Sequence, residues 1–165
     1  MSRWTITALI AMLASAMCIG WLLSKKIRNA MNNSNGTPSF AWPARGRVST
    51  KFGPRVHPIT GAKQTHNGID IAMAIGTDLK APADAVVLSV YTHATGGKSI
   101  ILQHAGGWRT GYAHLSQQLV KVGDKLTAGQ VFAKSGNTGA STGPHLHLTL
   151  TDPAGQKVDP EQYFA

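Results

Sequence analysis

The sequence has a single cysteine, which limits the chemistry open to the protein. Cys18 stands alone among 165 residues, so no disulfide can close within the chain and no zinc site can be built from cysteines. Any metal ion must therefore be held by histidine and carboxylate side chains. One cysteine does not indicate a redox compartment, but residues 39–165 contain none and so tolerate an oxidising one.

Acidic residues are also scarce. The chain has 7 Asp and Glu against 16 Lys and Arg, a net charge of +9, and such a chain favours polyanions such as nucleic acid, anionic lipid or anionic wall polymers. The sequence has no helix-turn-helix pattern, no aromatic-rich motif for single strands and no long block of Lys and Arg. A nucleic-acid partner is therefore not expected.

One long stretch lacks charge altogether. Residues 4–24 are 21 uncharged residues flanked on both sides by basic ones, and a helix of that length crosses a hydrocarbon core of about 30 Å. We therefore predict a membrane anchor over residues 1–28. The alternative is a signal segment cleaved at Ala14-Ser15-Ala16 and a secreted protein, although that cleavage would leave an apolar new terminus.

A polar stretch follows the predicted anchor. Residues 29–38 (NAMNNSNGTP) have the composition of a short linker, so the folded domain is expected over residues 39–165. The basic residues after the apolar stretch are nearly balanced by Arg3 plus the free α-amine before it, so charge alone does not set the orientation of the anchor. The nature of the substrate has to decide which side of the membrane the domain faces.

The remainder of the sequence lacks long segments of helical period. Short apolar stretches are punctuated by glycine, and four of them have the length and residue types of strands: 85–91, 99–103, 109–114 and 145–151. Turn residues recur at regular intervals. This pattern predicts an all-β sandwich or barrel.

A strict alternation marks residues 144–150 (PHLHLTL). Leucines occupy one face of the predicted strand, and His145, His147 and Thr149 the other. With the leucines toward the core, the two imidazoles project together about 6–7 Å apart along the strand. The alternative is a solvent-facing strand side that happens to contain histidine.

A second cluster occupies residues 65–71 (THNGIDI). His66 and Asp70 share strand parity, while Ile69 and Ile71 point the other way. An acid between two isoleucines is a poor core residue unless it is paired or bound to a metal. The alternative is a surface aspartate at a strand edge.

Together the two clusters offer two or three histidines and one aspartate. Three protein ligands and a water are typical of a catalytic zinc site, whereas a structural site has four protein ligands. Zinc would make hydroxide available near neutral pH, and a further histidine nearby could act as a base or polarise the substrate. His114, in residues 112–116 (YAHLS), is an additional candidate.

These motifs carry a family resemblance. From about residue 46 to residue 160 the sequence resembles the M23 family of metallopeptidases, also called lysostaphin or LytM-type peptidases. The matching motifs are residues 52–58 (FGPRVHP), 66–72 (HNGIDIA), 76–77 (GT), 112–116 (YAHLS), 122–124 (VGD), 129–130 (GQ), 136–147 (GNTGASTGPHLH) and 158–160 (VDP).

The resemblance implies a role for each matching position. His66 and Asp70 match the first two zinc ligands of the family and His147 the third, while His145 and His114 match its two catalytic histidines. The resemblance also implies a compact, mostly antiparallel β fold related to the lipoyl/biotinyl half-barrel. Family members that became non-catalytic activators usually lack several of these five residues.

The implied activity is a zinc-dependent endopeptidase that hydrolyses peptide cross-links of bacterial peptidoglycan. A short, membrane-anchored form without a wall-binding domain favours D-alanyl–diamino acid cross-links over glycine bridges, with a monomeric domain in the periplasm. A non-catalytic module that binds the wall or regulates another hydrolase is the main alternative. A lipoyl-type carrier is a third, but no lysine has the sequence context that a carrier needs.

The remaining histidines are interpreted structurally. His57 lies near a turn, where we expect it to support a loop, and His93 and His104 lie near Gly-Gly turns, where we expect them to be solvated. The family resemblance does not identify a tyrosine that would stabilise the transition state.

Overall fold

The computed structural model describes residues 39–56 and 61–165. The predicted anchor (residues 1–28), the predicted linker (residues 29–38) and His57 lie outside the described residues, so these three interpretations stay predictions. Within the described part, no helix is long and apolar enough to span a membrane.

The described chain is built of strands. It forms thirteen strands and two short 3-10 turns, and the described ranges contain no α-helix. The strands are β1 (Arg47–Thr50), β2 (Gly53–Val56), β3 (Lys63–His66), β4 (Ile69–Ala72), β5 (Asp78–Lys80), β6 (Ala85–His93), β7 (Gly97–Gln103), β8 (Arg109–Leu115), β9 (Gln117–Gln118), β10 (Lys125–Leu126), β11 (Val131–Lys134), β12 (His145–Thr151) and β13 (Lys157–Val158); the turns are η1 (Ala105–Gly107) and η2 (Pro160–Gln162). The prediction of an all-β fold is confirmed.

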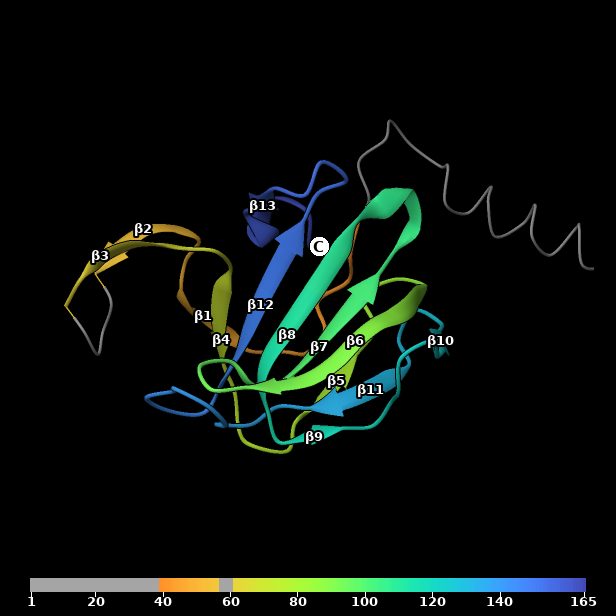
Figure 1. Ribbon diagram of the computed structural model, residues 1–165, viewed down its shortest axis with the longest axis horizontal. Helices are drawn as coiled ribbons and strands as arrows, with labels where there is room; N and C mark the ends of the chain where they lie inside the picture. The colour runs from red at the N-terminus through yellow and green to blue at the C-terminus, as the bar shows by residue number, and fades with distance from the viewer. Residues whose placement is uncertain (1–38, 57–60) are drawn as a thin grey trace, which may run out of the picture. The chain divides into compact units, whose positions relative to one another are not determined.

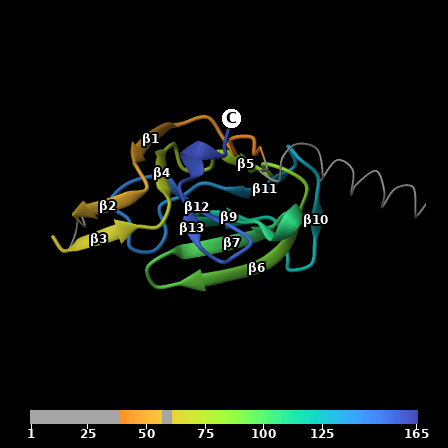
Figure 2. The same cartoon turned by 90° about the horizontal axis from the view of Figure 1, so that it is seen from above.

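Three sheets make up the domain (Figure 1). The large sheet has the order β1-β4-β12-β8-β7-β6-β10, with β13 beside β12, and its paired strands are antiparallel. A smaller sheet has the order β5-β11-β9, and β2 and β3 form a hairpin of their own. Figures 1 and 2 show this hairpin projecting beyond β1 and β4 at one side of the large sheet.

The four predicted strands are found within a few residues of their expected bounds. They correspond to β6, β7, β8 and β12, which are the long strands of the large sheet. Their length and their β-branched and apolar residues made them readable from sequence. The short strands around them were not predicted individually, because two to four residues carry too little periodicity.

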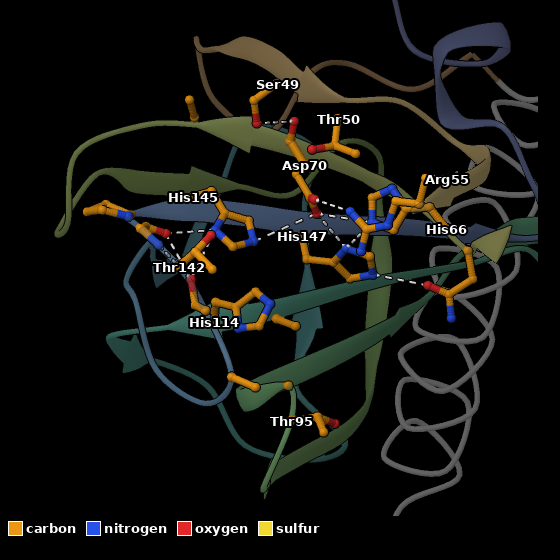
Figure 3. Close-up of a pocket in the computed structure, with 18 of the residues that line it drawn as sticks. Ser49, Thr50, Arg55, His66, Asp70, Thr95, His114, Thr142, His145 and His147 are labelled. Carbon is orange, nitrogen blue, oxygen red and sulfur yellow. Dashed lines mark hydrogen bonds and ion pairs between the residues drawn. The ribbon is translucent and has the colours of Figure 1, made fainter. Parts of the chain in front are cut away.

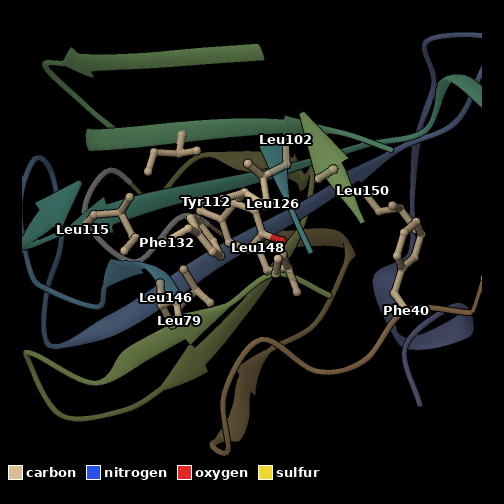
Figure 4. Close-up of a cluster of buried hydrophobic side chains, with 14 of the residues drawn as sticks. Phe40, Leu79, Leu102, Tyr112, Leu115, Leu126, Phe132, Leu146, Leu148 and Leu150 are labelled. Carbon is tan, nitrogen blue, oxygen red and sulfur yellow. The ribbon is translucent and has the colours of Figure 1, made fainter. Parts of the chain in front are cut away.

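The core lies between the large sheet and the smaller one (Figure 4). Leu146, Leu148 and Leu150 of β12 are fully buried, as their alternation predicts. Across the core Tyr112 of β8 meets Phe132 of β11, with ring centroids 4.7 Å apart in an edge-on arrangement. Each such side chain contributes about 1.5–3 kcal/mol by leaving water. The inner face of the large sheet therefore fixes the fold and leaves its outer face free for polar groups.

His104 is not solvated, and that prediction was wrong. Its side chain is only 6% exposed and packs 4.9 Å from the ring of Phe40. One ring nitrogen donates to the Asp84 carbonyl at 3.1 Å and the other accepts from the Thr110 hydroxyl at 2.8 Å. A Gly-Gly turn near a histidine therefore does not report its burial. His93, by contrast, is exposed as expected.

Burial of His104 makes the fold sensitive to acid. Burial lowers the pKa of His104 from 6.5 to about 4, although its bond to Asp84 acts the other way. Between these values the unfolded chain binds a proton that the folded chain does not, so stability falls as the pH falls from about 6.5 to about 4, by roughly 3 kcal/mol. We expect His104→Gln to flatten this loss, measured as the free energy of unfolding in urea at about pH 7 and about pH 4.5.

The exposed His93 offers a matched control. His93→Gln should keep the acid-dependent loss of the unmodified protein. An unchanged loss in His104→Gln would show that this histidine does not carry the effect.

Candidate metal centre

The pairing of two strands assembles the centre. In the antiparallel register of β4 with β12, Asp70 lies directly opposite His147, and His145 lies opposite Ala72. Facing residues of paired strands project to the same side of a sheet. Ile69 and Ile71 are buried in the core, so Asp70 points to the outer face, as its parity predicts. The carboxylate and both imidazoles of the H-x-H motif therefore share one surface (Figure 3).

His66 reaches this surface from a different strand. It ends β3, and Asn67 and Gly68 carry the chain over to β4. A Cβ on Gly68 would lie 2.3 Å from the Leu148 carbonyl oxygen, so only glycine lets the chain pass this close to β12. The sequence predicted that His66 and Asp70 lie together, but the tight crossing between two strands is what brings them there.

Three donor atoms converge at the centre. His147 Nδ1 lies 2.8 Å from Asp70 Oδ1, His66 Nε2 lies 3.2 Å from the same oxygen, and the two nitrogens are 3.1 Å apart. Zinc binds nitrogen and oxygen ligands at about 2.0–2.1 Å in tetrahedral geometry, which places ligand atoms about 3.3 Å from one another. The three atoms thus have nearly the spacing of one face of a zinc tetrahedron, and the residues fit the ion.

The far side of each imidazole fixes its tautomer. His66 Nδ1 donates to the Lys51 carbonyl oxygen at 2.9 Å, and His147 Nε2 donates to Asn67 Oδ1 at 3.2 Å. Because each neutral ring has only one N–H, the nitrogen that faces the centre carries a lone pair. Metal-binding histidines are oriented by such partners. Two lone pairs and a carboxylate oxygen therefore face one point, which suits a cation.

Asp70 is held ionised at this point. Burial acts to raise its pKa, but the hydrogen bonds and positive charges that His147 and His66 supply when their inner nitrogens are protonated outweigh burial, so the pKa lies well below its ordinary value. Arg55 Nη1 binds the second carboxylate oxygen at 3.3 Å. The inner oxygen Oδ1 is thus left to the two histidines.

A β-bulge brings His114 to the same surface. The register between β7 and β8 shifts from Ile100 opposite Tyr112 to Lys98 opposite Leu115, so β8 carries one extra residue there. His114 has φ of 60°, the only non-glycine residue of the described chain in the left-handed region. By strict alternation after the buried Tyr112, His114 would enter the core. The bulge turns its side chain outward instead, and Leu115 takes the core position.

His114 and His145 form a pair beside the three donors. Their ring centroids are 4.6 Å apart, and His145 Nε2 lies 3.7 Å from Asp70 Oδ1. His114 Nδ1 donates to the Thr138 carbonyl at 2.8 Å and His145 Nδ1 to the Gly143 carbonyl at 2.8 Å. Each Nε2 is therefore the free basic nitrogen of its ring.

The environment keeps His114 available as a base. Burial lowers its pKa, and the neighbouring His145 and His147 lower it further, against the opposing effects of Thr138 and Asp70. A lowered pKa leaves the ring neutral near neutral pH, which is the form that accepts a proton.

All five predicted residues line one groove of about 860 Å³ (Figure 3). Its size lies within the range of roughly 300–1,000 Å³ that is typical of ligand-binding pockets. No tyrosine is among the described residues that line it. The other lining residues are Ser49, Thr50, Arg55, Gln64, Thr65, Asn67, Ala72, Thr95, Gly96, Ala113, Ala140, Ser141, Thr142, Gly143 and Pro144.

The supporting residues were not predicted from the sequence. Arg55, Thr138 and Ser141 lie within motifs that resemble the family, but nothing in the motifs says what they contact. Ser141 Oγ lies 3.2 Å from His145 Nδ1. Asn67 sits between two predicted ligands, and that adjacency is the one signal that could have identified it.

The family model of peptidase family M23 matches residues 64–160, and the chain belongs to this family. Peptidoglycan DD-endopeptidase ShyA of Vibrio cholerae is 44% identical over 108 residues, 65% of this chain and 25% of that protein. An uncharacterized metalloprotease of Haemophilus influenzae is 47% identical over 114 residues, 68% of this chain and 24% of that protein. The chain therefore spans about a quarter of the length of these relatives.

Solved structures agree with this placement. A zinc containing peptidase from Vibrio cholerae superposes with a TM-score of 0.68 at 34% identity, covering 74% of this chain and 39% of that one. The catalytic domain of lysostaphin from Staphylococcus simulans superposes with a TM-score of 0.64 at 35% identity, covering 72% of this chain and 91% of that one. The resemblance to M23 metallopeptidases that the sequence motifs indicated is confirmed.

The left-handed backbone at His114 predicts an unusual order of stability. We expect His114→Gly to be more stable than His114→Ala by about 0.5–1 kcal/mol, because glycine adopts this conformation without the Cβ clash that alanine suffers. Urea unfolding measures the difference. The control is Gln103 on β7, whose backbone is not left-handed: there the alanine variant should be the more stable one. The same order at both positions would contradict the bulge geometry.

Proposed function

We propose that the protein is a zinc-dependent endopeptidase that hydrolyses peptide cross-links of bacterial peptidoglycan. The main support is that three donor atoms, His66 Nε2, Asp70 Oδ1 and His147 Nδ1, lie within 3.2 Å of one another. Membership of a peptidase family, a relative named as a peptidoglycan DD-endopeptidase and a similar structure titled a zinc containing peptidase support the proposal.

In this proposal the five residues divide into two groups. His66, Asp70 and His147 hold the ion, and when bound, zinc supplies Lewis acidity that polarises a carbonyl and makes hydroxide available near neutral pH. His145 completes the site from β12, the strand that also carries His147, and His114 completes it from the bulge of β8. The outer hydrogen bonds to Lys51 and Asn67 present the lone pairs of the ligand rings.

The paired histidines handle the proton. One Nε2 accepts the proton of the attacking water and delivers it to the nitrogen of the scissile amide, which leaves as an amine when the C–N bond breaks. The partner ring, protonated from solvent, donates a hydrogen bond to the oxygen of the tetrahedral intermediate. The neutral state of His114 suits the accepting role, and the bond from His145 to Gly143 aims its ring across the groove. The backbone carbonyls behind both rings hold them in place, so no reorganisation is needed during the reaction.

The cross-link is proposed to be of the D-alanyl–diamino acid type, with the domain in the bacterial cell envelope and, if residues 1–28 anchor it, on the periplasmic face of the inner membrane. The relative ShyA is named for a DD-endopeptidase activity, which supports this choice. The similarity to lysostaphin supports the fold and the centre equally well, so the bond has to be identified by experiment.

A muropeptide chromatogram tests the proposal. The zinc-loaded chain is incubated with purified peptidoglycan, one preparation with D-alanyl cross-links and one with glycine bridges. We expect loss of dimeric muropeptides from the first, with product masses that identify the cleaved bond. A chelator-treated sample and His145→Ala should both leave the dimers intact.

The opposite result is equally informative. If dimers persist in both walls although zinc is bound, the protein is not an endopeptidase, and a non-catalytic module that binds the wall or regulates a hydrolase replaces the proposal. Loss of dimers in the chelator-treated sample would instead exclude the metal from the reaction.

The outer partner of His147 gives a second prediction. Asn67→Ala removes the acceptor that sets the ring tautomer, and we expect zinc affinity to fall about tenfold, the lower end for such partners. Asn67→Asp places a carboxylate there and should restore or raise the affinity. Competition with a fluorescent zinc chelator measures both. Gln64→Ala, a groove residue on the same hairpin, should leave affinity unchanged; equal affinities in all four proteins would contradict the role of Asn67.

A further inference from the structure

A second groove continues from the metal centre along the outer face of the large sheet. It shares Asn67, Ala113 and His147 with the first groove. Its floor follows β12 and β8 away from the centre, where Thr149 pairs with Gly111 and Thr151 with Arg109. A Cβ on Gly111 would lie 2.6 Å from Thr149 Oγ1, so the absent side chain leaves this part of the floor open.

Three strands place donors side by side at the end of this floor. Thr151 on β12 is flanked by Arg109 of β8 and by Lys157 of β13, each its direct partner in the register. Lys157 Nζ donates to Thr151 Oγ1 at 2.8 Å and reaches back toward the metal centre to Thr149 Oγ1 at 3.2 Å. The ammonium is thus held over the floor by two buried hydroxyls.

This cluster of Thr149, Thr151, Arg109 and Lys157 has unused hydrogen-bond donors and contains no acidic residue. Both hydroxyls accept from Lys157, so their own hydrogens remain to be donated, as do the third hydrogen of the ammonium and the Arg109 guanidinium. All seven acidic residues of the chain are among the described residues. The ion pairs that lysine and arginine form there are Lys51–Glu161, Arg55–Asp70 and Lys134–Asp78.

The positive charge near Thr151 therefore has no protein counterion within the described residues. Partial burial of the ammonium and the charge of Arg109 both lower the pKa of Lys157, as expected for neighbouring cations without a carboxylate between them. A set of donors of this kind is complementary to an anion with several acceptor oxygens.

We propose that Lys157, Arg109, Thr149 and Thr151 form a subsite for a carboxylate of the substrate peptide. This inference rests on the proposed function, since it assigns the substrate that the same groove takes. Thr149 follows His147 by two residues, which is about 6–7 Å along the strand. A carboxylate bound there belongs to the residue next to the scissile bond or to the one after it.

The two classes of cross-link differ in the chemical group that they would present to this subsite. In a D-alanyl–diaminopimelate cross-link, the carbon bonded to the scissile nitrogen carries a free carboxylate, about 4 Å from the carbonyl carbon under attack. A hydrogen bond of about 2.8 Å then places its donor about 7 Å from that carbon, a length similar to the rise of about 6–7 Å from His147 to Thr149. A glycine bridge is neutral along its length and offers this subsite nothing.

The test uses two synthetic cross-linked peptides and the full zinc-loaded chain. One peptide contains a D-alanyl–diaminopimelate link with the adjacent carboxylate free, and in the other this group is a carboxamide. We expect kcat/KM to be roughly tenfold to a hundredfold higher for the carboxylate form, the usual range for a hydrogen bond to a charged group. In Lys157→Met the ratio of the two kcat/KM values should fall toward one, and Lys157→Arg should keep most of it.

A ratio of rates does not depend on how much of a variant is folded, which separates binding from a structural role of Lys157. Lys125→Met, on β10 at the opposite edge of the large sheet, removes the same charge elsewhere and should keep the preference of the unmodified protein. An equal loss in this control would assign the preference to net charge and overturn the subsite. Equal rates for the two peptides with the unmodified protein would overturn it as well.

Failure of the proposed function can be told apart from failure of the subsite. If the zinc-loaded protein cleaves neither peptide, the endopeptidase proposal falls, and the subsite is judged by fluorescence anisotropy with labelled forms of both peptides. Tighter binding of the carboxylate form that is lost in Lys157→Met supports the subsite, and equal dissociation constants overturn it.

Discussion

The register between β4 and β12 is the constraint on which the rest of the structure depends. It sets Asp70 opposite His147 on the outer face, and the same register sets Ile69 opposite Leu148 in the core. Because side chains alternate strictly across a strand, a slip of one residue would exchange the two faces. The leucines that hold the sheets together therefore also determine where the imidazoles point. Core packing and the geometry of the candidate metal centre thus depend on the same strand pair.

His114 reaches the groove only at a cost in conformational free energy, because strict alternation along β8 would have pointed its side chain into the core. Its left-handed backbone is unfavourable by about 1–2 kcal/mol for a residue with a side chain, and the surrounding chain has to hold it there. The bonds from its ring and its amide to Thr138 and Gly96 do so. Local strain of this kind is common at functional sites, and here it allows one strand to serve the core through Tyr112 and the groove two residues later.

The fold and the five central residues were largely predictable, for physical reasons that differ from residue to residue. The alternation of β12 was enough to assign it as a strand, since three polar and apolar pairs in a row fit no other regular structure. His66 and His114 were candidates from the residues alone, but their roles depended on the family resemblance, because a tight crossing at Gly68 and a bulge after Tyr112 leave no periodic signal. His104 was misjudged since burial depends on packing against Phe40, a residue far away in sequence. The contacts of Asn67 and Arg55 needed the folded chain, as did the row formed by Lys157 and Arg109.

The hairpin of β2 and β3 stands apart from both larger sheets, and two-stranded hairpins are marginal by themselves. It nevertheless supplies Arg55 and His66, and its attachment to the large sheet runs through Asp70 and His147. An ion at the centre would therefore link the β2–β3 hairpin to the large sheet. Binding of an ion there would thus strengthen the attachment of this hairpin to the large sheet.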